Sequence, residues 1–130
     1  MGIASVWTND GRNEILKVMT NQSTKYIEKF IIGDDNTTTP LVTDTALNSK
    51  IGAFTAKAFD SGFPTFDTAN QKMTIRGTVS STEANGNDIE EAALVDDGDT
   101  LIFTHDTFTS ITKNSSTEII LSWTVQLQNG

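Results

Sequence analysis

The sequence contains no cysteine and only two prolines, two arginines and one histidine. Without cysteine, disulfide bonds and thiolate metal sites are excluded. Arg12 and Arg76 are too few to form a phosphate clamp. The formal net charge of −8 also repels phosphate groups. Nucleic acid and anionic membranes are therefore not expected as partners.

Long apolar segments are also missing. No run approaches the roughly 18 apolar residues that a membrane-spanning helix requires. The start, MGIASVWTND, lacks the basic region and the apolar region of a signal peptide. We therefore expect a soluble protein that is made in the cytoplasm and has no membrane partner.

The sequence is instead rich in threonine, serine, asparagine and aspartate, residues that fill turns and the solvent-facing positions of strands. Its 130 residues, of which 36% are hydrophobic, suffice for one domain with a core of its own. We predict a single domain over residues 1–130.

Two segments alternate between apolar and polar residues, as half-buried strands do, the first of them strictly. The first is KMTIRGTVS, residues 72–80, and the second is IILSWTVQLQ, residues 119–128. A register shift of one residue in the second segment would expose the Trp123 side chain to solvent. The register of this strand is therefore strongly specified. The predicted core residues of the two segments are Ile75, Val79, Ile119, Leu121, Trp123, Val125 and Leu127.

The remaining segments predict one helix and several further strands. Residues 9–20 carry an apolar stripe and begin with Asn9 or Asp10 as a cap, and Trp7 is expected to pack just before this helix. Further strands are predicted over residues 25–33, 51–59, 88–96 and 100–106. The predicted fold is mainly β, an antiparallel β-sandwich with one short N-terminal α-helix.

Catalytic chemistry has little support in this sequence. His105 is the only histidine, and the adjacent Asp106 would point to the opposite face of a strand. No motif places a nucleophile beside it. We therefore expect His105 to be a surface histidine of a strand, and the chain not to be an enzyme and to have no cofactor.

Two acidic turns are the weak candidates for a cation site. Asp96, Asp97 and Asp99 surround Gly98, but the spacing lacks the later glutamate of an EF-hand loop. Asp34 and Asp35 form the second acidic turn. Aspartates of this kind more often bond to the backbone of their own turn, so no metal site is predicted and a weak Ca²⁺ site is the alternative.

Aromatic residues outside the two alternating strands are the weak candidates for an interface. Phe63 and Phe66 flank Pro64 in a predicted loop, and Tyr26 lies in an imperfectly alternating strand. Such side chains serve either a subunit interface, a ligand-binding surface or local packing.

Four segments together resemble a known kind of domain. They are TNDGRNEILKVM (8–19), KYIEKFIIGDD (25–35), PLVTDTALNSKI (40–51) and the long segment from Ser81 to Leu127. This order is similar to the N-terminal attachment domains of tail-fibre and collar-fibre proteins of tailed viruses. The matching positions are Gly33, Thr43–Leu47, Glu91, Leu94, Ile111–Lys113 and Trp123–Val125.

The resemblance implies a structural protein of the virion, made in the host cytoplasm. In fibres such a domain usually precedes a shaft and tip, whereas this sequence ends at Gly130, shortly after its last strand. We therefore expect a stand-alone assembly or adaptor module of the tail, baseplate, collar fibre or capsid surface. Its partners would be other virion proteins and itself, as a trimer or hexamer. The alternative is a small carbohydrate- or receptor-binding β-sandwich.

Overall fold

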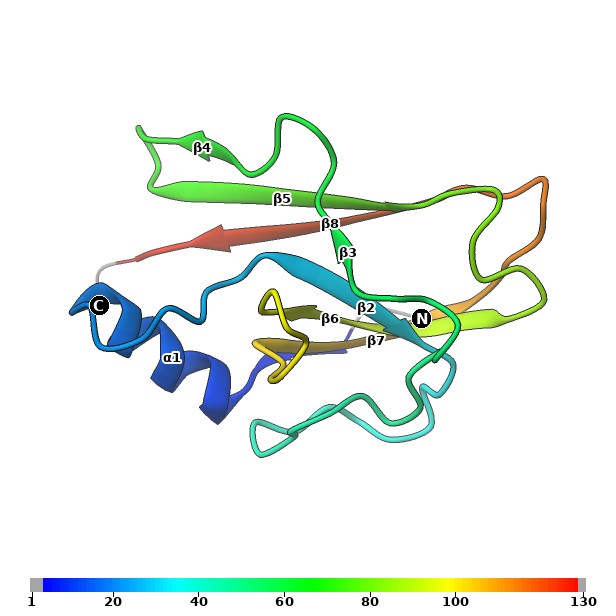
Figure 1. Ribbon diagram of the computed structural model, residues 1–130, viewed down its shortest axis with the longest axis horizontal. Coiled ribbons are helices and arrows are strands. Elements are labelled where there is room, and N and C mark those ends of the chain that lie inside the picture. Colours follow the sequence, from blue (N-terminus) through cyan, green and yellow to red (C-terminus); the bar gives the residue numbers. More distant parts are fainter. Residues whose placement is uncertain (1–3, 129–130) are drawn as a thin grey trace.

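Two antiparallel β-sheets face each other in the computed structural model, which describes residues 4–128 (Figure 1). The predicted mainly β sandwich with one N-terminal helix is confirmed. The ends of the predicted domain, residues 1–3 and 129–130, lie outside the described residues. The elements are β1 (Ala4–Trp7), α1 (Asn9–Met19), β2 (Lys29–Gly33), β3 (Lys57–Ala58), β4 (Thr65–Asp67), β5 (Lys72–Val79), β6 (Asp88–Val95), β7 (Thr104–Thr112) and β8 (Ile119–Gln126).

The larger sheet has the strand order β1-β7-β6-β2-β3, and the smaller sheet has the order β4-β5-β8. In Figure 1 the smaller sheet lies above the larger one, and α1 lies at the end toward which β8 runs. The two strands with alternating sequences, β5 and β8, pair along their whole length, with Ile75 opposite Trp123 and Val79 opposite Ile119. Their apolar faces therefore point the same way, toward the larger sheet.

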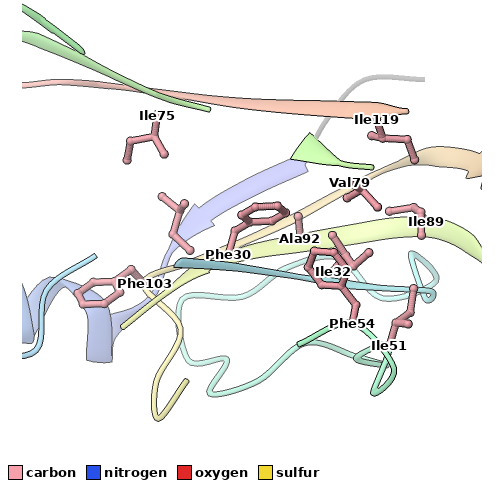
Figure 2. Packing of buried hydrophobic residues seen from close by; sticks show 11 residues of the cluster. Phe30, Ile32, Ile51, Phe54, Ile75, Val79, Ile89, Ala92, Phe103 and Ile119 are labelled. Carbon is pink, nitrogen blue, oxygen red and sulfur yellow. The ribbon is translucent and has the colours of Figure 1, made fainter. Parts of the chain in front are cut away.

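The main core fills the space between the sheets (Figure 2). Phe30 of β2 is fully buried, and its ring lies 5.9 Å from the ring of Trp123 and 5.5 Å from that of Phe54. Gly77 of β5 allows this close approach, because a Cβ atom there would lie 2.3 Å from a ring carbon of Phe30. Buried side chains of the smaller sheet that complete the core are Ile75, Val79 and Ile119.

A second, smaller apolar cluster lies on the outer face of the larger sheet. Ile31 of β2 and Ala93 of β6 are paired there, and Leu47 of the long connection 34–56 packs on them. A bulge between Ile89 and Glu91 shifts the register of β6 against β7. The bulge explains why β6 alternates poorly in sequence: Ile89 and Ala92, three positions apart, both join the main core.

Several predicted boundaries differ from the structure. The strand predicted over 25–33 begins at Lys29, and the one predicted over 100–106 is shifted to Thr104–Thr112. Of the strand predicted over 51–59, only Lys57–Ala58 is formed. The short edge strands β1 and β4 were not predicted, and Trp7 lies within β1. These two strands contain too few residues to show an alternation of apolar and polar side chains.

The helix cap and one core residue are also corrected. Thr8, rather than Asn9 or Asp10, is the N-cap of α1, and its hydroxyl accepts a hydrogen bond from the Gly11 amide at 2.9 Å. The prediction of Leu127 as a core residue is wrong, because its side chain is 79% exposed beyond the end of β8. Within residues 4–128, α1 is the sole helix, and it is too short and too polar to cross a membrane.

Candidate functional site

His105 lies in the interior, so its prediction as a surface residue is wrong. It belongs to β7, and its side chain has no exposed area. Its Nδ1 lies 2.7 Å from a carboxylate oxygen of Asp44, and its Nε2 lies 2.9 Å from Oε1 of Glu91. The ring therefore joins strand β6 to the long connection 34–56 through two acidic side chains.

Glu91 is the centre of this cluster. Its carboxylate is fully buried, and it accepts the backbone amides of Asn48 at 2.8 Å and Ser49 at 2.7 Å in addition to its contact with His105. Gly33, opposite Glu91 on β2, leaves room for the carboxylate, since a Cβ atom there would lie 2.4 Å from Oε2. The buried charge is thus surrounded by donors, as a stable buried carboxylate requires.

The two acids favour the protonated form of His105. Burial alone would lower the pKa of His105, but the hydrogen bonds to Glu91 and Asp44, together with their negative charges, raise the pKa above its ordinary value. Both ring nitrogens are occupied within the protein, and the ring does not reach solvent. This arrangement holds the connection 34–56 against the sheet and leaves no open nitrogen for a substrate.

Asp106 lies on the opposite face of β7, between the two sheets, as neighbouring positions of a strand require. Its carboxylate accepts hydrogen bonds from the Ser5 hydroxyl, from the Trp123 indole at 2.8 Å and from the Thr104 hydroxyl at 3.3 Å. Burial raises the pKa of Asp106, and the bonds from Ser5, Trp123 and Thr104 oppose that shift. Trp123 is therefore fixed by a polar bond as well as by its contact with Phe30.

The acidic turn 96–99 is organised by partners from its own chain. Asp96 accepts the Thr100 amide at 2.7 Å and its hydroxyl at 2.6 Å. Asp97 pairs with Lys29 at 3.0 Å, and Asp99 pairs with Lys50. The three carboxylates are thus directed at different partners, and residues 4–128 contain no cluster of acids, histidines or cysteines suited to a metal ion.

The three aromatic candidates occupy different environments. Phe63 is half-buried, and the guanidinium of Arg76 lies 4.5 Å from the centre of its ring. Its role is therefore local packing. Phe66 of β4 is 68% exposed and Tyr26 is 52% exposed, so both side chains are accessible on the surface.

The sandwich is open along one side, between β1 of the larger sheet and β8 of the smaller one, which are not paired with each other. We call this side the open margin. It contains a hollow of about 200 Å³ and an adjoining, largely apolar one of about 520 Å³. Trp7 and Val125 line both hollows. The other apolar residues of the open margin are Ile15, Ile27, Phe66, Met73, Ala92, Phe108, Leu121, Trp123 and Leu127.

The open margin explains why the last strand is less buried than its pattern suggests. Leu121, Trp123 and Val125 of β8 face the core but are only half-buried. The outer edge of β8 has no pairing strand among residues 4–128. The sequence contains a signal for the partial exposure of β8, because the strand alternates between apolar and polar residues, as a strand with one solvated face does. Residues 119–128 also carry no charge.

Two further polar residues with structural roles, the buried Lys113 and the partly buried Asp44, had no direct signal in the sequence. Lys113 is fully buried, and its ammonium bonds to the Asn85 side chain at 2.7 Å and the Asn114 carbonyl at 3.1 Å. Asp44 also orders its own turn by accepting the Leu41 amide at 2.8 Å. The sequence pointed to both residues only through the resemblance of their segments to fibre attachment domains.

Comparison of the chain with family models, with curated proteins and with solved structures gives no match.

Proposed function

We propose that this protein is a structural module of a virus particle that acts by packing against other subunits. The tail, the baseplate, the collar fibre and the capsid surface are the locations that fit the resemblance. The observation that carries the proposal is the open margin, where apolar side chains of β1, α1, β5 and β8 line a surface hollow. A surface of this kind is typical of a protein–protein contact.

The positions that carry the resemblance support this proposal through their structural roles. Glu91 and Asp44 fasten the connection 34–56 to the larger sheet, and Lys113 orders the turn around Asn85. Each of these polar groups bonds within the chain, and none of them lines the hollows of the open margin. Residues that maintain a rigid shape in this way suit a building block better than a catalyst.

The proposal is tested by the mass of the protein in solution and by its presence in particles. Size-exclusion chromatography with light scattering, followed by negative-stain microscopy of the peak, should give a discrete oligomer. An antibody against the chain should also label purified particles from the source culture. A strictly monomeric protein that is absent from purified particles would contradict the proposal.

A second candidate is a carbohydrate- or receptor-binding module, favoured by one observation. Phe66, which is 68% exposed, lies at the rim of the apolar hollow of the open margin. An exposed aromatic ring beside a hollow can stack on a sugar or a peptide. Binding on a glycan array that Phe66→Ala abolishes would favour this function, whereas an array without binding would count against it.

A further inference from the structure

We propose that the outer edge of β8 pairs antiparallel with the same edge of a second copy, which joins the two smaller sheets into one continuous sheet. This inference rests on the proposed function, and it names the partner and the contact. It starts from the backbone, since an unpaired strand edge presents a row of amide and carbonyl groups that another strand can satisfy.

The length of β8 separates it from the other edge strands. The two sheets end in β1, β3, β4 and β8, which have four, two, three and eight residues. Natural proteins keep unpaired edges short, and the other three edges of this molecule follow that rule. β8 is the exception, and it is regular along its whole length, with eight successive residues in register with β5.

The composition of β8 is the second observation. Edges that must not pair usually carry an inward-pointing charge, a proline or a bulge. Residues 119–126 contain no charge and no proline, although the chain as a whole carries a net charge of −8. A neutral edge is the part of such an acidic surface on which a second copy meets little repulsion.

Antiparallel pairing about a two-fold axis matches like faces of the two strands. Directly opposed residues point to the same side of a sheet, so the half-buried Leu121, Trp123 and Val125 of both copies would share the inner face. Ser122 and Thr124 would share the outer face, where hydroxyl pairs across strands are favourable. The inner face of the second strand would then lie beside the open margin, whose apolar residues it would help to cover.

The same geometry limits the size of the assembly. Pairing through β8 uses the long edge of each copy, and the joined sheet then ends in β4, which has three residues. The contact is isologous and closes at two copies. It therefore predicts a dimer, or a hexamer built from dimers, and it does not generate the trimer that was one expectation from the resemblance.

The test places like charges on the outer face of β8. Ser122 and Thr124 are exposed and make no side-chain hydrogen bond within residues 4–128, so the fold should tolerate Ser122→Lys with Thr124→Lys. In the dimer these lysines would face each other, and we expect the dissociation constant from sedimentation equilibrium to rise about tenfold or more. The circular dichroism spectrum should remain that of the wild type.

The matched control carries the same two substitutions near the other edge of the same sheet, as Ser61→Lys with Thr65→Lys, both at exposed positions. It should dimerise like the wild type, although it has the same altered net charge. A third protein with Ser122→Glu and Thr124→Glu separates repulsion from misfolding. An equimolar mixture of the lysine and glutamate forms should dimerise more tightly than either form alone.

The outcomes distinguish this inference from the proposed function. A wild-type oligomer that is insensitive to the charges on β8 would overturn the β8 contact and leave the assembly function standing. A protein that is monomeric at all concentrations but present in purified particles would also overturn the β8 contact and leave the assembly function standing. A monomer that is absent from particles would overturn both. A dimer that the lysines weaken and the mixture restores is the expected result.

Discussion

Two adjacent residues of β7, His105 and Asp106, make buried polar contacts on opposite faces of the larger sheet. His105 and Asp106 are adjacent in sequence, but one faces the connection 34–56 and the other faces the smaller sheet. Each is buried and bonded to groups far away along the chain. Removing one member of a buried, hydrogen-bonded pair leaves the other member buried without a partner. Substitution of these residues should therefore lower the stability of the fold.

The cluster around His105 predicts a pH dependence of stability. The folded protein holds the His105 proton more tightly than the unfolded chain, so the associated stabilisation is complete below the ordinary pKa of 6.5 and is lost as pH rises through the raised value. We expect the free energy of unfolding, measured with urea, to fall over this range. In His105→Asn that fall should be absent. Parallel pH profiles for the two proteins would show that the cluster does not contribute in this way.

Trp123 predicts a coupled effect with Asp106. Trp123→Phe keeps most of the ring contact with Phe30 but removes a donor from a buried carboxylate, at a cost of about 1–3 kcal/mol in unfolding free energy. Trp123→Ala should cost about 3 kcal/mol, the lower end for an aromatic residue, because the ring is half-buried. In an Asp106→Asn background the cost of Trp123→Phe should shrink. Additive costs in this double-mutant cycle would count against the bond.

At the scale of elements, the junction between β1 and α1 illustrates how a short helix is fixed by its neighbours. Thr8 accepts the Gly11 amide and donates its hydroxyl to the Ile102 carbonyl at 2.6 Å, so one side chain caps the helix and ties it to the segment before β7. Gly11 is the sole buried residue of α1 and lies against the backbone of Phe103. The helix is thus held at its first turn.

This contact predicts that Gly11→Ala destabilises the protein, although alanine favours a helix over glycine by about 1 kcal/mol. A Cβ atom at this position would lie 2.5 Å from the Phe103 Cα atom, which cannot move without shifting the backbone. We expect a loss of about 1–3 kcal/mol by urea denaturation. Asn13→Ala, at an exposed position of the same helix, is the control and should be neutral or slightly stabilising.

At the scale of the whole molecule, the net charge and the open margin have opposite effects on self-association. The surface carries a net charge of −8, which keeps copies apart, while the open margin and the neutral edge of β8 bring them together. The balance between these effects should respond to salt, because screening weakens the repulsion but leaves backbone pairing and apolar contact largely unchanged.

We therefore expect self-association to tighten as ionic strength rises. Between about 0.01 M and about 0.15 M salt the screening length falls from about 30 Å to about 8 Å, which shields the two acidic bodies from each other. Sedimentation equilibrium at several sodium chloride concentrations measures the effect directly. Association that weakens with added salt would indicate a contact made by opposite charges, in place of the neutral edge of β8.

The sequence by itself determined the elements whose pattern is local. Alternation specified β5 and β8 with their inner faces, and the apolar stripe specified α1. These assignments hold because the period of side chains along a strand or helix is a property of the backbone. The absence of charge from residues 119–128 was also visible in the sequence.

Only the tertiary structure decided which residues meet across long separations. His105 bonds to Asp44, 61 positions away, and the bulge in β6 directs Glu91 to the same side. Leu127 belongs to the apolar pattern of the last strand but extends past the sheet that would cover it. Burial depends on what lies opposite a residue in space, so a period in the sequence can assign a face but not the partner that covers it.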